Sequence, residues 1–244
     1  MMYWKNKFYK ESVMKTIGLI GGLAWQSTVY YYKIINEMVA ESLGGRHSAS
    51  LLIRSLDFNP IDQMMKKNEW DKIIREITCA AQILDREGAS YILICCNTIH
   101  KIADAISKSL HNAELINIID VVAEAIHLQN MTKVGLLGSI YTMEEPFYKE
   151  RLSNLHKVKT LIPNSEERKL IMHVIETELG KGEINLQSRK SFLKIIDDLV
   201  QRGAEGVILG CTEIPLLISQ KDTQVPLFDS TYLHAKAAVD LALR

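Results

Sequence analysis

The sequence lacks an excess of either charge, and this absence narrows the class of protein. Lysine plus arginine and aspartate plus glutamate number 29 each, so the formal net charge is zero. A nucleic-acid-binding domain normally carries a strongly basic face. No apolar run approaches the roughly 20 residues that a bilayer-spanning helix needs. We therefore predict neither a nucleic-acid partner nor a membrane partner.

Cysteine is scarce, and its spacing argues against a metal site. Only Cys79, Cys95, Cys96 and Cys211 are present, and no two of them form a CxxC pair. Cys95 and Cys96 are adjacent, and neighbouring residues of a strand point to opposite faces, so we predict no metal site. Residues 1–13 lack the apolar segment of a secretory signal. Free thiols without such a signal predict a reducing, cytoplasmic location.

The glycines do not form a nucleotide-binding motif. Gly21 and Gly22 follow a predicted strand, but the sequence there is neither GxGxxG nor a P-loop. Nucleotide binding is therefore not predicted. Hydrophobic residues make up 47% of the chain, which suits a globular protein with a large buried core.

What is present is an alternation of short apolar runs with helical patterns. The apolar runs predict strands over residues 15–20, 50–56, 91–96, 115–119, 133–138, 158–163, 206–211 and 226–229. The helical patterns predict helices over residues 26–42, 69–86, 98–110, 165–180 and 232–243. Asp57–Pro60 is predicted to be a polar turn, and Asp120 to end the fourth strand.

The two series of strands repeat in the same order. Three matched pairs give the offset: Gly18 and Gly135 are 117 positions apart, Cys96 and Cys211 are 115 apart, and Asp120 and Asp229 are 109 apart. Strands that alternate with helices form parallel sheets with right-handed crossovers. We predict an α/β fold with two similar doubly wound parallel-sheet lobes, formed by internal duplication, and an active site in the cleft between them.

The domain boundaries follow from this repeat. Residues 1–13 are predicted to be an N-terminal extension, 14–119 the first lobe and 120–230 the second lobe. The final helix, 231–244, could also pack on the first lobe, and the sequence leaves this open.

Cys96 and Cys211 lie at matched strand ends, each just before a predicted helix. Ligands of open α/β sheets bind at the carboxyl ends of the strands. The amides and dipole of a helix N-terminus lower a thiol pKa from about 8.5 towards neutrality, so we expect a thiolate here near pH 7. Taken singly, either cysteine could be a buried hydrophobe, but the duplication favours a site. Cys79 and Cys95 are predicted to be buried hydrophobes.

Two stretches resemble the cysteine motifs of the aspartate/glutamate racemase family. They are Cys96-Asn97-Thr98-x-His100 and Gly210-Cys211-Thr212-Glu213, accompanied by the opening segment 17–28. The resemblance extends over nearly the whole chain from Met14. It implies racemisation of an amino acid, most often aspartate or glutamate, without a cofactor. One cysteine would remove the α-proton and the other would return a proton to the opposite face. Cys96 and Cys211 would be this catalytic pair, and the family also suggests a homodimer.

The same resemblance implies roles for the neighbouring residues. Asn97, Thr98 and Thr212 would bind the substrate together with backbone amides. Their alternative role is only to cap helices. Glu213 and His100 would orient these groups rather than transfer protons.

The residues that would bind the substrate's side chain depart from the family pattern. Lys181 matches the family's lysine, although it could be a solvated residue at a helix end. The family's arginine after the second strand is missing from residues 57–63, and Arg54 lies within the strand. This departure leaves room for substrates other than aspartate and glutamate. Trp25 and His47 also resemble family positions near the cleft.

Other functions fit parts of the pattern. Another thiol-based isomerase, a decarboxylase or a hydantoin racemase could use the same fold. A non-catalytic two-lobed binding protein would use the cysteines structurally, but the polar residues after both thiols argue against it. A thiol redox protein would need the two cysteines at disulfide distance.

Overall fold

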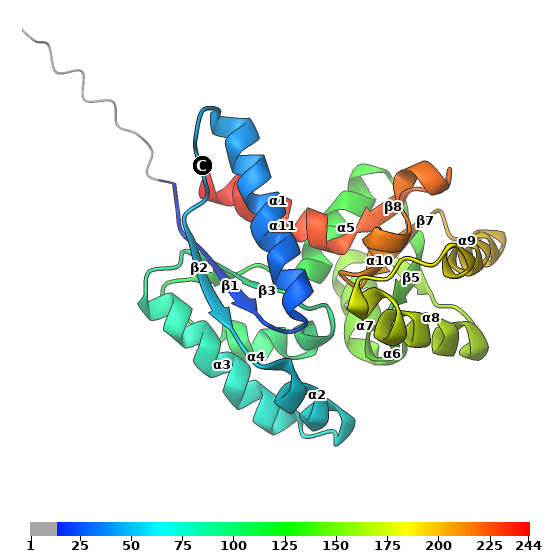
Figure 1. Ribbon diagram of the computed structural model, residues 1–244, viewed down its shortest axis with the longest axis horizontal. Helices are drawn as coiled ribbons and strands as arrows, with labels where there is room; N and C mark the ends of the chain where they lie inside the picture. The colour runs from blue at the N-terminus through cyan, green and yellow to red at the C-terminus, as the bar shows by residue number, and fades with distance from the viewer. Residues whose placement is uncertain (1–13) are drawn as a thin grey trace, which may run out of the picture.

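The computed structural model describes residues 14–244, and the predicted extension at residues 1–13 lies outside the described residues. The described strands form two four-stranded sheets, and every strand pair in them is parallel. The strand orders are β2-β1-β3-β4 and β6-β5-β7-β8. Figure 1 labels β1, β2 and β3 of the first sheet and β5, β7 and β8 of the second. The predicted α/β fold with two similar doubly wound lobes is therefore confirmed.

The first sheet and the elements between its strands come first in the chain. They are β1 (Ile17–Gly21), α1 (Trp25–Leu43), β2 (Leu51–Ser55), α2 (Phe58–Lys66), α3 (Trp70–Arg86), β3 (Tyr91–Ile94), η1 (Thr98–Ile102), α4 (Ala103–Ser107) and β4 (Glu114–Leu115). The remaining elements are α5 (Ile118–Leu128), β5 (Lys133–Gly138), α6 (Ile140–Glu144), α7 (Pro146–His156), β6 (Lys159–Leu161), α8 (Ser165–Thr177), η2 (Leu179–Lys181), α9 (Leu186–Gln201), β7 (Gly206–Gly210), α10 (Ile214–Leu217), η3 (Gln220–Asp222), β8 (Leu227–Asp229) and α11 (Ser230–Ala242).

The central strand β1 is buried on both faces. Ile17 and Leu19 belong to a core shared with α1 and α11, whereas Ile20 belongs to a core shared with α3. Successive side chains of a strand point to opposite faces, so a strand covered by helices on both sides is apolar at nearly every position. This explains why the central strands read as continuous apolar runs. Within residues 14–244, no helix is both long enough and apolar enough to cross a bilayer.

The two helices that follow the fourth strands each pack on the opposite lobe. α11 follows β8 of the second sheet, yet Ala235 and Ala238 pack in the first-lobe core with Ile17. α5 follows β4 of the first sheet, yet Val122 packs in the second-lobe core with Val134. α5 and α11 also contact each other, and α11 lies beside α1 (Figure 1). The exchange of these helices ties the lobes together.

The predicted polar turn over Asp57–Pro60 is wrong, because these residues begin a helix. The side chain of Asp57 accepts a hydrogen bond from the backbone N–H of Asn59 at 3.1 Å and caps α2. Aspartate is a favoured N-cap residue, which explains the helix start at this position. The predicted helix over 98–110 is also divided, into η1 and α4.

The predicted strand ending at Asp120 is likewise wrong, because Asp120 lies in α5. β4 ends at Leu115, and the side chain of Asn117 accepts a hydrogen bond from the backbone N–H of Ile119 at 2.9 Å. This cap starts α5 in the way that Asp229 caps α11. Asn117, 112 positions before Asp229, is therefore its structural counterpart.

Candidate active site

A cavity of about 740 Å³ lies between the lobes, where the central strands of both sheets end. Cys96 follows β3 and Cys211 follows β7, and both line this cavity. Four more residues singled out in the sequence also line it: Asn97, Thr98, Thr212 and Glu213. The duplicated strand ends therefore meet at one site, as parallel sheets of this kind predict.

The Cys96 thiol is partly buried at the start of η1. Burial raises its pKa to about 11, and the Glu213 carboxylate acts in the same direction. The backbone N–H groups of Ile99 and Thr98 favour the thiolate but offset only part of this effect. Loss of hydration therefore raises the thiol pKa by more than the N–H groups of this short helical turn lower it.

The Cys211 thiol is in a comparable position and contacts a carboxylate directly. Its sulfur donates a hydrogen bond to Oε2 of Glu213 at 2.8 Å, and the Thr212 hydroxyl donates to the same oxygen at 2.8 Å. Burial, followed by the negative charge of Glu213, raises the pKa of Cys211 well above its usual value. The prediction that a helix start brings these thiol pKa values towards neutrality is wrong, because enclosure in the cavity dominates.

Hydroxyl groups join the two lobes at the cavity wall. The Thr98 hydroxyl lies 2.9 Å from that of Ser139, which caps α6 in the second lobe. In the mirrored arrangement, Ser27 of the first lobe makes a short hydrogen bond with Thr212. Each threonine that follows a cysteine is therefore held by a serine of the opposite lobe. Sequence reasoning missed Ser139, although the repeat places it after β5 as it places Gly22 after β1.

Asn97 presents an unused hydrogen-bond acceptor. Its side chain is 4% exposed, and its Nδ2 donates to the hydroxyl of Ser230 at 3.1 Å. Its Oδ1 is buried and has no partner among the described residues. Because buried polar atoms are nearly always hydrogen-bonded, this oxygen is suited to a donor group of a ligand in the cavity.

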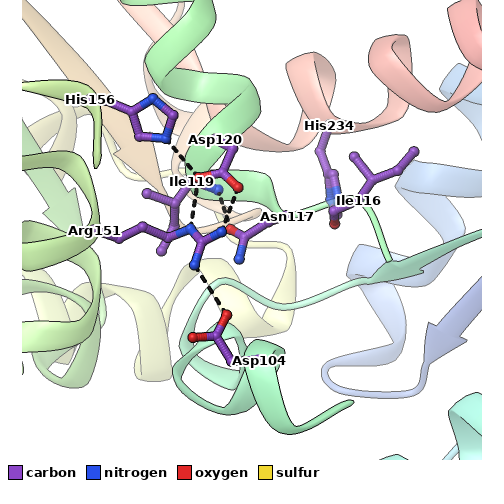
Figure 2. A network of polar contacts seen from close by, with 8 residues as sticks. All are labelled: Asp104, Ile116, Asn117, Ile119, Asp120, Arg151, His156 and His234. Atoms are coloured by element: carbon purple, nitrogen blue, oxygen red, sulfur yellow. Dashed lines mark hydrogen bonds and ion pairs between the residues drawn. The ribbon is translucent and has the colours of Figure 1, made fainter. Parts of the chain in front are cut away.

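His100 supports Cys96 from behind the cavity and does not line it. Its Nδ1 donates to the backbone carbonyl of Cys96 at 2.8 Å. Burial lowers the pKa of His100 to about 4, so the ring is neutral at pH 7. The ring packs edge-on against the ring of His234. In Figure 2 His234 lies beside Ile116, and its Nε2 is hydrogen-bonded to the backbone carbonyl of Ile116 at 2.8 Å.

A second polar network joins the lobes away from the cavity (Figure 2). The guanidinium of Arg151 in α7 donates twice to Asp120 in α5, at 2.7 and 2.6 Å, and once to Asp104 in α4, at 3.1 Å. His156 lies 2.7 Å from the same Asp120 carboxylate. The sequence had no local signal for this network, since its members come from three separate helices.

Two residues that the family resemblance indicated, Lys181 and His47, are exposed and do not line the cavity. Arg54, within β2, is also exposed and outside the cavity lining. Gly180, next to Lys181, does line it, and its carbonyl accepts a hydrogen bond from Gln26 at 2.9 Å. Trp25 also lines the cavity. No group of three or more His, Cys, Asp or Glu side chains within residues 14–244 is arranged to hold a metal ion.

Comparison with known proteins shows the same architecture. The family model described as Asp/Glu/Hydantoin racemase matches residues 20–238. A crystal structure from Yersinia pestis described as an Asp/Glu racemase is 42% identical, with a TM-score of 0.89, over 95% of this chain and 100% of that one. An aspartate racemase homologue from Pyrococcus horikoshii OT3 is 35% identical, with a TM-score of 0.84, over the same shares of the two chains.

Curated sequences give weaker matches. A glutamate racemase from Hydrogenobaculum is 28% identical over 139 residues, which are 57% of this chain and 51% of the relative. A glutamate racemase from Sulfurihydrogenibium is 29% identical over 147 residues, which are 59% of this chain and 55% of the relative. The chain therefore spans about half the length of these curated relatives.

Proposed function

Since the chain belongs to the Asp/Glu/Hydantoin racemase family, we propose that it interconverts the two enantiomers of an amino acid, using Cys96 and Cys211 as two bases and no cofactor. Family membership supports an amino-acid racemase activity. The observation that carries the two-base mechanism is that the two cysteines come from opposite lobes and line one cavity.

Racemisation requires two groups, because a single base would return the proton to the face from which it came. In the proposed mechanism one cysteine thiolate removes the α-proton. The other cysteine, as a thiol, donates its proton to the opposite face of the α-carbon. The charge that develops on the substrate needs preorganised donors. Thr98 lines the cavity and its hydroxyl is suited to this role, whereas the hydroxyl of Thr212, which also lines the cavity, already donates to Glu213.

The thiolate has to form in the complex, because burial raises both thiol pKa values. A substrate carries an α-ammonium group, and a positive charge near a sulfur favours the thiolate. The unpartnered Oδ1 of Asn97 could accept a hydrogen bond from this ammonium. Glu213 holds the sulfur of Cys211 and is close enough to accept its proton.

Proton NMR in D₂O tests the proposal. A structure described as an aspartate racemase homologue and a relative described as a glutamate racemase make aspartate and glutamate the first substrates to measure, followed by a panel of other amino acids. We expect loss of the α-proton signal and appearance of the other enantiomer on chiral chromatography, without an added cofactor. Cys96→Ser and Cys211→Ser should each lower racemisation by about 10²–10⁴-fold, the usual contribution of a positioned proton-transfer group.

The exposed Cys79 provides the matched control, because it lies on α3 outside the cavity. Cys79→Ser should racemise at the wild-type rate. The two-cysteine mechanism would be contradicted if the folded protein exchanged the α-proton of no amino acid. It would also be contradicted if exchange persisted in both Cys96→Ser and Cys211→Ser.

A further inference from the structure

Carboxylates dominate the charged lining of the cavity. The acidic lining residues are Asp57, Asp62, Glu176 and Glu213. Within residues 14–244, Lys66 is the single lysine or arginine among the lining residues, and its ammonium is 2.6 Å from the carboxylate of Asp62. The formal charge of this lining is therefore negative.

These carboxylates divide into two groups by depth. Glu213 is buried beside Cys211, whereas Asp57 and Glu176 are exposed and therefore lie near the mouth of the cavity. Asp57 caps α2 of the first lobe, and Glu176 lies on α8 of the second. A substrate whose α-carbon lies between the cysteines would extend its side chain towards carboxylates from both lobes.

The deep part of the cavity offers an acceptor independently of these charges. Asn97 lines the cavity, and its buried Oδ1 has no hydrogen-bond partner among the described residues. An acceptor of this kind is satisfied by a ligand donor such as an ammonium group. The carboxylates of the lining are hydrogen-bond acceptors as well.

A second carboxylate on the substrate would be poorly accommodated here. It would meet like charges, which disfavour binding, and the one nearby ammonium is already paired with Asp62. A side chain that ends in a hydrogen-bond donor would instead pair with carboxylate oxygens, and charge-assisted hydrogen bonds are the stronger kind.

We infer, on the basis of the proposed racemase activity, that the substrate is a monocarboxylic amino acid whose side chain ends in a hydrogen-bond donor, with a cationic side chain favoured over a neutral one. Asp57 and Glu176 determine this specificity. Aspartate and glutamate are then poor substrates of this chain.

Two pairs of amino acids that differ at the end of the side chain test the inference. We expect kcat/KM for α-proton exchange to be at least about tenfold higher for glutamine than for glutamate, and for lysine than for norleucine, which corresponds to one favourable or unfavourable charge contact. Equal or reversed ratios in both pairs would overturn it.

Variants that remove the charges of Asp57 and Glu176 test whether these two residues cause the preference for lysine. Asp57→Asn removes the charge but keeps a good N-cap for α2. Combined with Glu176→Gln, it should lower the preference for lysine over norleucine towards unity. Glu166→Gln is the control, because Glu166 lies on the same helix α8, outside the cavity, and pairs with Lys169. A lysine preference that is unchanged in the double variant would contradict the roles of Asp57 and Glu176.

Calorimetric binding of the same four amino acids to Cys96→Ser gives a readout that needs no turnover. If no amino acid is exchanged by the wild-type protein but lysine still binds more tightly than norleucine and glutamine more tightly than glutamate, the racemase proposal fails and the specificity inference stands. If exchange occurs and glutamate is preferred over glutamine, the racemase proposal stands and the specificity inference fails. Failure of all four to bind or react would overturn both.

Discussion

The hydroxyl groups of Thr98 and Ser139 lie 2.9 Å apart although the two residues belong to different lobes. The contact between Ser27 and Thr212 repeats this arrangement with the lobes exchanged. Because Thr98 lies two positions after Cys96 and Thr212 directly follows Cys211, the relative placement of the sulfurs depends on how the lobes meet. The proposed active site is therefore a property of the interface between the lobes.

Replacing Thr98 tests this dependence. Thr98→Val keeps the shape of the side chain but leaves the hydroxyls of Ser139 and Thr142 without this partner. We expect a loss of about 1–2 kcal/mol in the free energy of unfolding and about a 10–100-fold fall in kcat/KM. Thr98→Ser retains the hydroxyl and should behave nearly as the wild type. Equal activity of the valine and serine variants would show that the hydroxyl contact does not position Cys96.

Gly22 is placed where a side chain cannot fit. Its φ is +76°, and a Cβ there would lie 2.0 Å from the carbonyl oxygen of Leu56. Gly22→Ala should therefore lower the free energy of unfolding by more than about 3 kcal/mol, through strain and overlap together. Gly44 separates the two effects, because it has a φ of +72° but open space around it. Gly44→Ala should cost only about 1–2 kcal/mol, so similar denaturation midpoints for the two variants would rule out the overlap.

The pH dependence of alkylation tests the ionisation of Cys96. Because burial raises the thiol pKa to about 11, only a small fraction is thiolate at pH 7. The rate of reaction with a small alkylating reagent should rise about tenfold per pH unit from pH 7 to pH 9, since the thiolate is the nucleophile. Peptide mass spectrometry distinguishes Cys96 from the exposed Cys79 in the same sample. A rate at Cys96 that is already constant above pH 7 would contradict the raised pKa.

The contact between Arg151 and Asp120 should stabilise the protein against acid. Burial acts to raise the pKa of Asp120, but the hydrogen bonds from Arg151 and His156 outweigh it and hold the pKa below its usual value. A carboxyl whose pKa is lowered on folding contributes stability above its unfolded value, and this contribution is lost as the pH falls through the folded value. Acid unfolding followed by circular dichroism should therefore begin at a higher pH in Arg151→Met.

At neutral pH the same variant should lose about 1–3 kcal/mol of the free energy of unfolding, because hydrogen bonds to charged groups are lost. Arg46→Met, at an exposed arginine in the loop after α1, is the control. If the two variants unfold at the same pH and the same denaturant concentration, the network around Asp120 does not stabilise the joined lobes.

The sequence predicted those parts of the site that depend on local pattern. Apolar runs marked β3 and β7, and the repeat placed Cys96 and Cys211 at equivalent strand ends. Both residues line the cavity, as do Asn97, Thr98, Thr212 and Glu213. Lys181 is exposed and outside the cavity lining, whereas the neighbouring Gly180 lines the cavity, so its predicted role in substrate binding stays a prediction.

The prediction that Cys79 is buried is wrong, and its position on the helix explains why. Free cysteine is usually buried, so a buried hydrophobe was predicted, yet Cys79 is exposed. Ile73, Ile77 and Ala80 define the buried face of α3, and Cys79 follows Ile77 by two positions. Two positions turn a helix by more than half a revolution, which places Cys79 on the solvent side. The helical period in the sequence contained this information, whereas residue type alone did not.

By itself the sequence determined the order of strands and helices, the duplication and the presence of a thiol at each matched strand end. These properties depend on periodicity and on residues close together in the chain. Only the tertiary structure decided that α5 and α11 exchange lobes, that Thr98 meets Ser139, and that both thiol pKa values are raised. Packing and desolvation depend on groups brought together from distant parts of the chain, so the same cysteine that a helix start would ionise is kept protonated by its enclosure between two lobes.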